Sequence, residues 1–302
     1  MEKSTHPVEV LRIYERILKE SSADGRYIDT GTGHKIHVIE AGTGPALVYL
    51  HGGGAAAHTF LPVLEHLEGV RTIVPDRPGY GLSDPVEIGH KGYHDMAVDM
   101  TDRILDALGV DQVSLAGSSG GGVWAIWYAL AYPERVHRLV LLGSAPLLPG
   151  TYAQVPLRIM AFPVIGDIIA RIPTNESTIV SMMKMMGEGE TIVNYPEMIE
   201  ALAASNNDPV ASKATRTEYS AFLNLLGFRT NMKIRAEDLS KLSMPTLVIW
   251  GEKDPLGGAD VARAVSEAIP NSQLELLPAG HVPYFGYPKK TAKLISDFVL
   301  SV

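Results

Sequence analysis

Short apolar runs with strand character alternate with amphipathic helical stretches along most of the chain. After a predicted N-terminal helix, strands are expected at 34–40, 46–50, 71–75, 112–116 and 138–142, and helices near 59–67, 93–108 and 120–132. Strands that alternate with helices predict a largely parallel sheet that is covered by helices on both faces. The pattern therefore predicts the α/β class.

The alternation stops after Gly143 and resumes only about a hundred residues later. The intervening segment, residues 145–243, has a mostly helical pattern and is too long for a simple loop. We expect it to form a helical cap, or lid, on a core made of residues 1–144 and 244–302. In the second part of that core, strands are expected at 246–250 and 273–277 and helices near 260–268 and 290–300.

The amino-acid composition limits which kinds of catalytic chemistry and which partners are possible, and it says less about the fold. The chain has 302 residues, 46% of them hydrophobic, so it can bury one sizeable core without dividing into independent domains. Its formal net charge of -8 is spread without a block of about five or more like charges, which argues against a nucleic-acid partner. Cysteine is absent, which excludes disulfides, thiolate metal sites and a cysteine nucleophile.

The N-terminal stretch Met1–Glu20 mixes charged and apolar residues and lacks the continuous apolar core of a signal peptide. No run in the chain reaches the roughly eighteen apolar residues needed to span a bilayer. We therefore expect a cytoplasmic protein without a membrane span. The sequence carries no signal of the oligomeric state.

A candidate nucleophile lies in the glycine-rich segment Gly117–Gly121, which joins a predicted strand to a predicted helix. This is the context of a G-x-S-x-G nucleophile elbow, a sharp turn that needs small residues two positions before and after the serine. Ser119 has Gly117 and Gly121 at those positions. Ser118, with Ala116 and Gly120 at the same offsets, is the alternative, as is a glycine-rich turn without chemistry. We predict Ser119 as the nucleophile.

Attack on an acyl carbon moves negative charge onto its oxygen, so an oxyanion hole of backbone N–H groups is required. One donor is expected to be the N–H of Gly120, which follows the nucleophile at the start of a helix. The second donor is expected from the segment His51–Gly54, with Gly53 favoured and Gly54 as its alternative. The plain alternative is that this segment is only a tight turn, ordered by His51.

The general base is expected late in the chain, after the nucleophile and the acid. His281 lies in a loop directly past a predicted strand, where its ring can project over the sheet edge. His137 also follows Ser119 but lies in a strand run, so we interpret it as structural. We predict His281 as the base, and we expect neither a metal nor a cofactor.

The acid has to hold the histidine ring in one tautomer and stabilise the imidazolium. Asp254 fits this role because it follows the predicted strand at 246–250 and so emerges at the same sheet edge. Glu252 and Asp260 are the competing carboxylates, whereas the end of the preceding strand, at 143–145, offers none. Ser119, His281 and Asp254 therefore form the predicted catalytic triad.

Taken in order, these motifs resemble the α/β-hydrolase superfamily over nearly the whole chain, the cap excepted. The resemblance implies a mostly parallel sheet flanked by helices, with a helical cap inserted after the sixth strand. It also implies an esterase-like or carbon–carbon hydrolase-like serine enzyme. The segment 76–84 resembles the family's turn after its fourth strand, and we interpret it as mainly structural. The matching motifs are 51–54, 76–84, 117–121, 250–254 and 280–281.

Single residues separate the branches of that superfamily. Haloalkane dehalogenases and epoxide hydrolases carry aspartate at the elbow, so Ser119 argues against both. The triple glycine 52–54 resembles the loop of carbon–carbon hydrolases of ring-cleavage products, but Val282 stands where those enzymes usually carry tryptophan. A perhydrolase or haloperoxidase-like activity would use the same triad, and a ligand receptor could retain the same pocket.

The cap segment is rich in methionine, a flexible side chain that fills irregular gaps and lines adaptable apolar surfaces. We therefore expect a small hydrophobic ester-like substrate, with Arg158, Arg171 and Arg229 as the cations that could overturn this. The alternative is that these side chains only pack the cap against the core. The expected wall consists of Met160, Met182, Met183, Met185, Met186, Met198 and Met232, with Phe162, Ile165, Ile168, Ile169 and Phe222.

Overall fold

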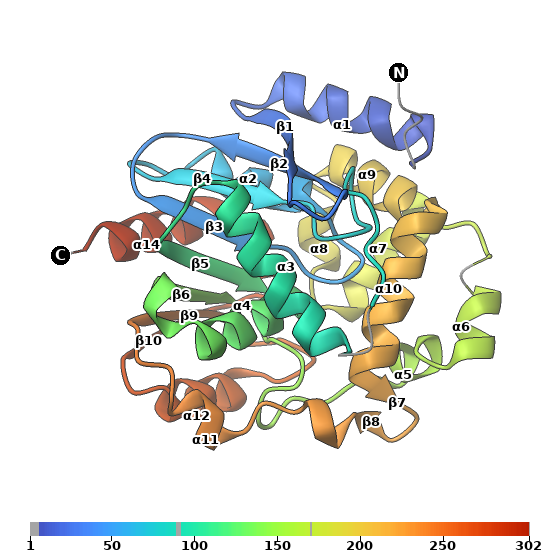
Figure 1. Cartoon of the computed structure of the whole chain (residues 1–302). Coiled ribbons are helices and arrows are strands. Elements are labelled where there is room, and N and C mark those ends of the chain that lie inside the picture. Colours follow the sequence, from blue (N-terminus) through green and yellow to red (C-terminus); the bar gives the residue numbers. More distant parts are fainter. Residues whose placement is uncertain (1–5, 89–91, 170, 302) are drawn as a thin grey trace.

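The computed structural model describes residues 6–88, 92–169 and 171–301, and its centre is an eight-stranded sheet (Figure 1). The strand order is β1-β2-β4-β3-β5-β6-β9-β10; β2 pairs antiparallel with β1 and β4, and the other strand pairs are parallel. This confirms the predicted fold class. The strands are β1 (Asp24–Asp29), β2 (Lys35–Ala41), β3 (Ala46–Leu50), β4 (Arg71–Pro75), β5 (Val113–Ser118), β6 (Val136–Leu142), β9 (Thr246–Gly251) and β10 (Ser272–Leu277).

Helices cover both faces of this sheet, and consecutive strand residues point to opposite faces. Val48 and Leu50 belong to the core cluster under α3, α4 and α12, whereas Leu47 and Tyr49 belong to the cluster under α1, α2 and α14. In Figure 1, α3 and α4 cross in front of the sheet. The core helices are α1 (Val8–Glu20), α2 (Leu61–Leu64), α3 (Tyr93–Ala107), α4 (Gly120–Ala131), α12 (Ala259–Ala268), α13 (Pro283–Gly286) and α14 (Pro288–Leu300), with short 3-10 turns η1 (Ala57–Phe60) and η2 (Pro133–Arg135).

The sequence analysis missed one strand and misjudged one helix. It located five strands before the cap, because Asp24–Asp29 shows no apolar alternation: only Ile28 of this edge strand is buried. The helix expected near 59–67 is a 3-10 turn followed by one turn of α-helix, Leu61–Leu64. With β1 included, the inserted segment follows the sixth strand.

The segment between β6 and β9 is mostly helical, and its helices from α5 to α10 stand beside the sheet on the right of Figure 1. We propose that residues 145–243 act as the cap. Asp208 caps α10 by accepting a hydrogen bond from Val210 N at 2.8 Å. The elements are α5 (Val155–Met160), α6 (Pro163–Ile169), α7 (Glu176–Met185), α8 (Gly189–Ile192), α9 (Pro196–Asn207), α10 (Pro209–Phe222), β7 (Leu223–Asn224), β8 (Gly227–Phe228), η3 (Thr230–Met232) and α11 (Ala236–Leu239).

The parallel strands end nearly level, which brings five loops to one edge of the sheet. The glycine loop follows β3, Ser119 follows β5, Ser144 follows β6, Asp254 follows β9 and His281 follows β10. Ligand sites of open parallel sheets lie at this carboxyl edge. Neighbouring residues at the strand ends include the pairs Leu50 with Gly117, Ser118 with Leu142, Leu142 with Ile249, and Leu277 with Gly251.

The part of the chain that the structure describes holds no helix of the length and apolar character that crossing a membrane requires.

Candidate active site

The predicted elbow has the backbone of a strained turn. Ser119 has φ 51° and ψ -122°, a conformation that side chains other than glycine rarely adopt, and it lies between the end of β5 and the start of α4. A Cβ on Gly117 would overlap Gly121 O, and a Cβ on Gly121 would overlap Leu50 O. Ser118 is buried in β5. The geometry thus supports Ser119 rather than Ser118 as the nucleophile.

His281 and Asp254 meet at the same sheet edge. His281 Nδ1 lies 3.0 Å from Asp254 Oδ2, and both side chains are buried, with exposed fractions of 6% and 4% for the two residues. Glu252 and Asp260 are exposed, and Asp260 pairs with Arg263 instead. Of the carboxylates considered from the sequence, the structure therefore brings only Asp254 to the histidine.

Ser144 also belongs to this cluster, and the sequence analysis missed it. Its N–H donates to Asp254 Oδ2 at 3.0 Å, and its Oγ lies 3.2 Å from His281 Nδ1. Leu256 N donates to the other oxygen, Oδ1, at 2.8 Å. The two backbone donors orient the carboxylate toward the ring. The only sequence signal for Ser144 is its place at the end of a predicted strand.

The charges of Asp254 and His281 shift each other's pKa. Burial alone would raise the pKa of Asp254, but the charge and hydrogen bond of His281 and the Leu256 and Ser144 donors hold that pKa below 3.8. Burial would lower the pKa of His281, but the charge and hydrogen bond of Asp254, with a further contribution from Glu188, raise that pKa above 6.5. Asp254 is therefore ionised at neutral pH, beside a histidine that is protonated more readily than usual.

These shifts predict how activity depends on pH. Since only neutral His281 can accept a proton, kcat/KM for an ester should rise with pH and level off above an apparent pKa higher than 6.5. Glu188 is buried, and its Oε1 accepts from Val282 N at 3.3 Å. Glu188→Gln removes a negative charge near the ring and should lower the apparent pKa.

Profiles of kcat/KM against pH at constant ionic strength check this. Glu190→Gln, a matched change at an exposed position of α8, should leave the apparent pKa where it is. An apparent pKa below 6.5, or equal shifts in the two variants, would contradict the assignment of His281 as the base.

Ser119, His281 and the glycine loop line one cavity of about 220 Å³. Among the residues that the structure describes, no hydrogen bond joins Ser119 to His281, as is common before substrate binds. A Cβ on Gly52 would lie 3.1 Å from Ser119 Cβ, so the glycine loop packs tightly against the nucleophile. The three features expected from the sequence thus share one space.

Of the two glycines considered for the second oxyanion donor, Gly53 lies next to Gly120 and Gly54 does not. A Cβ on Gly120 would lie 3.5 Å from the nitrogen of Gly53, so the two residues are neighbours at the start of α4. Gly54, with φ 69°, faces Thr215 instead. His51 orders this loop as expected: its Nδ1 donates to Gly52 O at 2.8 Å, and its Nε2 accepts from Arg77 N at 2.9 Å. Burial and the charge of Arg77 lower the pKa of His51 to about 3, so it stays neutral.

Methionines line the cavity, although the expected wall is only partly right. Phe222 lines the cavity, whereas Phe162, Ile165 and Ile168 are exposed, with exposed fractions of 38%, 42% and 58%. Met198 packs in the core cluster under α1, and Met232 packs against the opposite cluster. The methionines that do line the cavity are Met160, Met182, Met183, Met185 and Met186.

The arginines considered from the sequence do not line this cavity. Arg158 Nε donates to Ala153 O, Arg229 Nε donates to Ser220 O, and Arg171 is exposed. A carboxylate that the sequence analysis did not single out, Glu218 of α10, does line it. No local motif marks Glu218, because it reaches the site only through the packing of the cap segment on the core.

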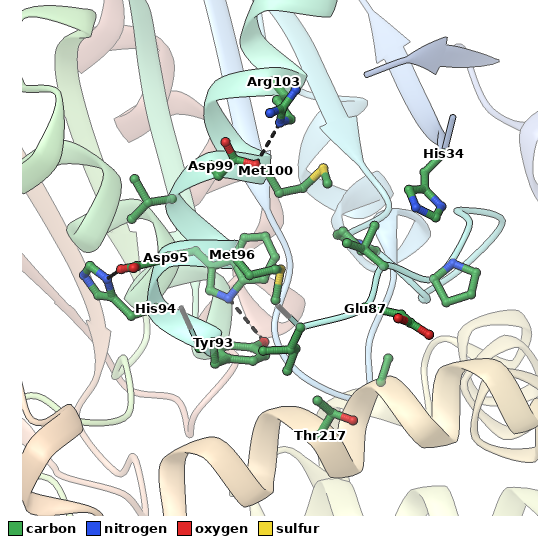
Figure 2. Close-up of a pocket in the computed structure, with 18 of the residues that line it drawn as sticks. His34, Glu87, Tyr93, His94, Asp95, Met96, Asp99, Met100, Arg103 and Thr217 are labelled. Carbon is green, nitrogen blue, oxygen red and sulfur yellow. Dashed lines mark hydrogen bonds and ion pairs between the residues drawn. The ribbon is translucent and has the colours of Figure 1, made fainter. Parts of the chain in front are cut away.

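A second, wider cavity of about 1430 Å³ lies between α3 and α10 (Figure 2). Tyr93 and Trp124 form part of its wall and are joined by a hydrogen bond from Trp124 Nε1 to the Tyr93 hydroxyl at 3.3 Å. Ser119, Asp254 and His281 are not among its lining residues. The chemistry expected from the sequence therefore belongs to the smaller cavity.

Comparisons with known proteins agree with the fold described above. The family model described as alpha/beta hydrolase fold matches residues 45–288. A 2-hydroxy-6-oxononadienedioate/2-hydroxy-6-oxononatrienedioate hydrolase of Burkholderia vietnamiensis is 26% identical over 94% of this chain and 99% of its own. Among solved structures, a carboxylesterase from Bacillus subtilis has a TM-score of 0.75 at 21% identity, covering 97% of this chain and 98% of its own. The 2-hydroxy-6-oxo-6-phenylhexa-2,4-dienoate hydrolase from Rhodococcus has a TM-score of 0.75 at 19% identity, covering 92% and 99%.

Proposed function

The chain belongs to the α/β-hydrolase fold family, and from this premise we propose that it is a serine hydrolase that cleaves carboxylic esters of small hydrophobic substrates. The observation that carries the proposal is one cavity in which Ser119, the glycine loop and His281 meet. Around these groups the lining is largely apolar. Among the lining residues that the structure describes, none is lysine or arginine.

Each step of the proposed reaction follows from a group at this edge. Ser119 Oγ attacks the ester carbonyl carbon while His281 Nε2 takes the hydroxyl proton, and Asp254 stabilises the imidazolium that forms. The carbonyl oxygen becomes an oxyanion that accepts hydrogen bonds from the Gly53 and Gly120 N–H groups. His281 then gives its proton to the leaving alkoxide, so that an alcohol departs and an acyl-Ser119 ester remains.

The second half of the reaction repeats these roles with water. His281 takes a proton from water, the hydroxide attacks the acyl carbon, and the oxyanion again forms at Gly53 and Gly120. The proton returns to Ser119 Oγ as the bond to the acid product breaks. No group beyond the serine, the histidine, the aspartate and the backbone donors is required.

Carbon–carbon cleavage is the second candidate function, because the relative from Burkholderia vietnamiensis is named as a hydrolase of dienedioates and is similar over 94% of this chain. The name of that substrate describes a dicarboxylate. Here Glu218 lines the cavity, and no lysine or arginine is among the described lining residues. The carboxylate of a bound substrate would meet Glu218 with no cation in the lining to bind it, so the cavity favours neutral esters.

The preferred acyl group tests this choice. With 4-nitrophenol as the common alcohol, kcat/KM for the hexanoate should exceed that for the acetate by about tenfold or more, because added methylenes contact the methionine wall. The mono-ester of adipic acid matches hexanoate in chain length but adds a carboxylate, and it should be the poorer substrate. A spectrophotometric assay of 4-nitrophenol release measures all three.

Three outcomes would contradict the proposal. A preference for the adipate mono-ester over hexanoate would show that the cavity accepts an anion. Efficient cleavage of a vinylogous diketone, together with only trace ester turnover, would favour carbon–carbon cleavage. Tight binding of ester analogues with negligible turnover would indicate a ligand receptor instead.

A further inference from the structure

The two carboxylate oxygens of Glu218 have different surroundings. Oε2 accepts hydrogen bonds from the hydroxyls of Tyr80 at 3.2 Å and Tyr93 at 3.0 Å, and it lies 2.9 Å from Arg77 Nη1. Burial and the charge of Glu218 raise the pKa of both tyrosines, so their hydroxyls remain donors. With an exposed fraction of 1%, Glu218 is held in one orientation by this side.

Arg77 balances the charge of this carboxylate from within the core. It is fully buried, and its guanidinium carbon lies 5.1 Å from the ring centre of Tyr80 and 5.0 Å from that of Trp124. Its Nη1 is close to Oε2, but the N–H direction does not meet hydrogen-bond geometry, so the contact is an ion pair. The buried guanidinium therefore offsets the charge of a carboxylate that also accepts two hydrogen bonds.

The other oxygen, Oε1, faces the candidate oxyanion hole. A Cβ on Gly53 would lie 3.0 Å from Oε1, and a Cβ on Gly120 would overlap it. Among the residues that the structure describes, none donates a hydrogen bond to Oε1. Glycine at position 120 is therefore what allows a charged acceptor to stand beside the acyl site.

Building on the proposed function, we propose that Glu218 Oε1 is a specificity-determining acceptor that binds a hydrogen-bond donor carried on the acyl chain next to the scissile carbonyl. The class of substrate is a hydroxyacyl or aminoacyl ester. Glu218 lines the cavity, so a bound acyl chain excludes water from Oε1, and a carboxylate oxygen that is left without a donor beside a developing oxyanion is unfavourable. A substrate hydroxyl or ammonium satisfies Oε1, whereas an alkyl group leaves it unpaired and an anion is repelled.

The test compares 4-nitrophenyl esters of 2-hydroxybutyrate and 2-methoxybutyrate. The two acyl groups have similar inductive effects, but only the first has a donor. In the wild-type protein, kcat/KM should favour the hydroxy ester by about tenfold or more. Equal rates, or a preference for the methoxy ester, would overturn the proposal.

Glu218→Gln should abolish this preference. The three groups around Oε2 favour the amide oxygen there, so the amide NH2 should face the cavity and act as a donor. The ratio of hydroxy to methoxy ester should fall to about one or below, since a hydrogen bond to the charged acceptor contributes about a tenfold preference that is now lost. Glu197→Gln, an exposed carboxylate-to-amide change on α9, should keep the wild-type ratio.

Arg77 without its counter-charge could prevent folding of Glu218→Gln. The double variant Arg77→Gln with Glu218→Gln removes both charges, and it should show the same loss of preference. A wild-type ratio retained in a folded variant would overturn the role of Glu218. Suppose that cleavage of 4-nitrophenyl butyrate depends on Ser119 but the hydroxy and methoxy esters react equally. The role of Glu218 is then wrong, while the proposed ester hydrolase function still stands. Absence of any Ser119-dependent cleavage contradicts the proposed function itself.

Discussion

Replacing Ser119 with alanine is expected to lower kcat for ester hydrolysis by about 10⁴-fold to 10⁶-fold while leaving the fold intact. Alanine has no nucleophile, so neither attack nor the acyl-enzyme is possible. Its small side chain still fits the turn between β5 and α4, where Ser119 has φ 51°. Steady-state rates with 4-nitrophenyl hexanoate, together with thermal unfolding of both proteins, provide the measurement.

Ser118→Ala is the matched control. Ser118 is buried at the end of β5, next to the elbow, but its backbone lies in a regular strand. We expect a loss within about tenfold, because the change removes one buried hydroxyl and leaves the nucleophile in place. If Ser118→Ala abolishes activity and Ser119→Ala does not, the register of the elbow is wrong.

Asp254→Asn is expected to lower kcat by about 10³-fold to 10⁴-fold with a smaller effect on KM. The carboxylate accepts from His281 Nδ1 and from two backbone N–H groups, those of Ser144 and Leu256. An asparagine has one oxygen for these donors, so its NH2 must face either the Leu256 N–H, or the ring together with the Ser144 N–H. Turned toward the ring, it favours the tautomer with hydrogen on Nε2, which cannot take the Ser119 proton.

Glu252→Gln is the control for this change. Glu252 lies two residues before Asp254 on the same loop and is exposed, so its removal should change kcat by less than about threefold. A pH profile separates the two roles of Asp254, because the asparagine variant should also lose the elevated His281 pKa. Equal losses in the two variants would show that the loop, rather than the carboxylate, is required.

Much of the fold was predictable from local pattern. Strand runs such as 247–250 are continuously apolar because both faces of a parallel strand are buried, and all six residues of β9 are indeed buried. The edge strand β1 was missed for the opposite reason: five of its six residues are exposed, so no apolar alternation marks it. Pairing with β2 is the contact that makes it a strand.

The cap shows the limit of composition as a guide. Its methionine content predicted an apolar wall, and five methionines do line the cavity. Composition could not separate these from Met198, which packs in the core, or from Phe162, which is exposed. Which face of a cap helix meets the cavity depends on how the helix packs on the core. The local sequence of the helix does not determine that packing.

By itself, the sequence determined the class of sheet, the elbow around Ser119 and the chain order of serine, aspartate and histidine, because each depends on local constraints. A strained turn needs glycine at its flanks, and parallel strands deliver their loops to one edge. Only the tertiary structure decided that Ser144 supports Asp254 and that Glu218 stands between Gly53 and Gly120. Those contacts join residues that are distant along the chain. They depend on burial and on the pairing of charged groups in the folded protein, and no local sequence pattern marks them.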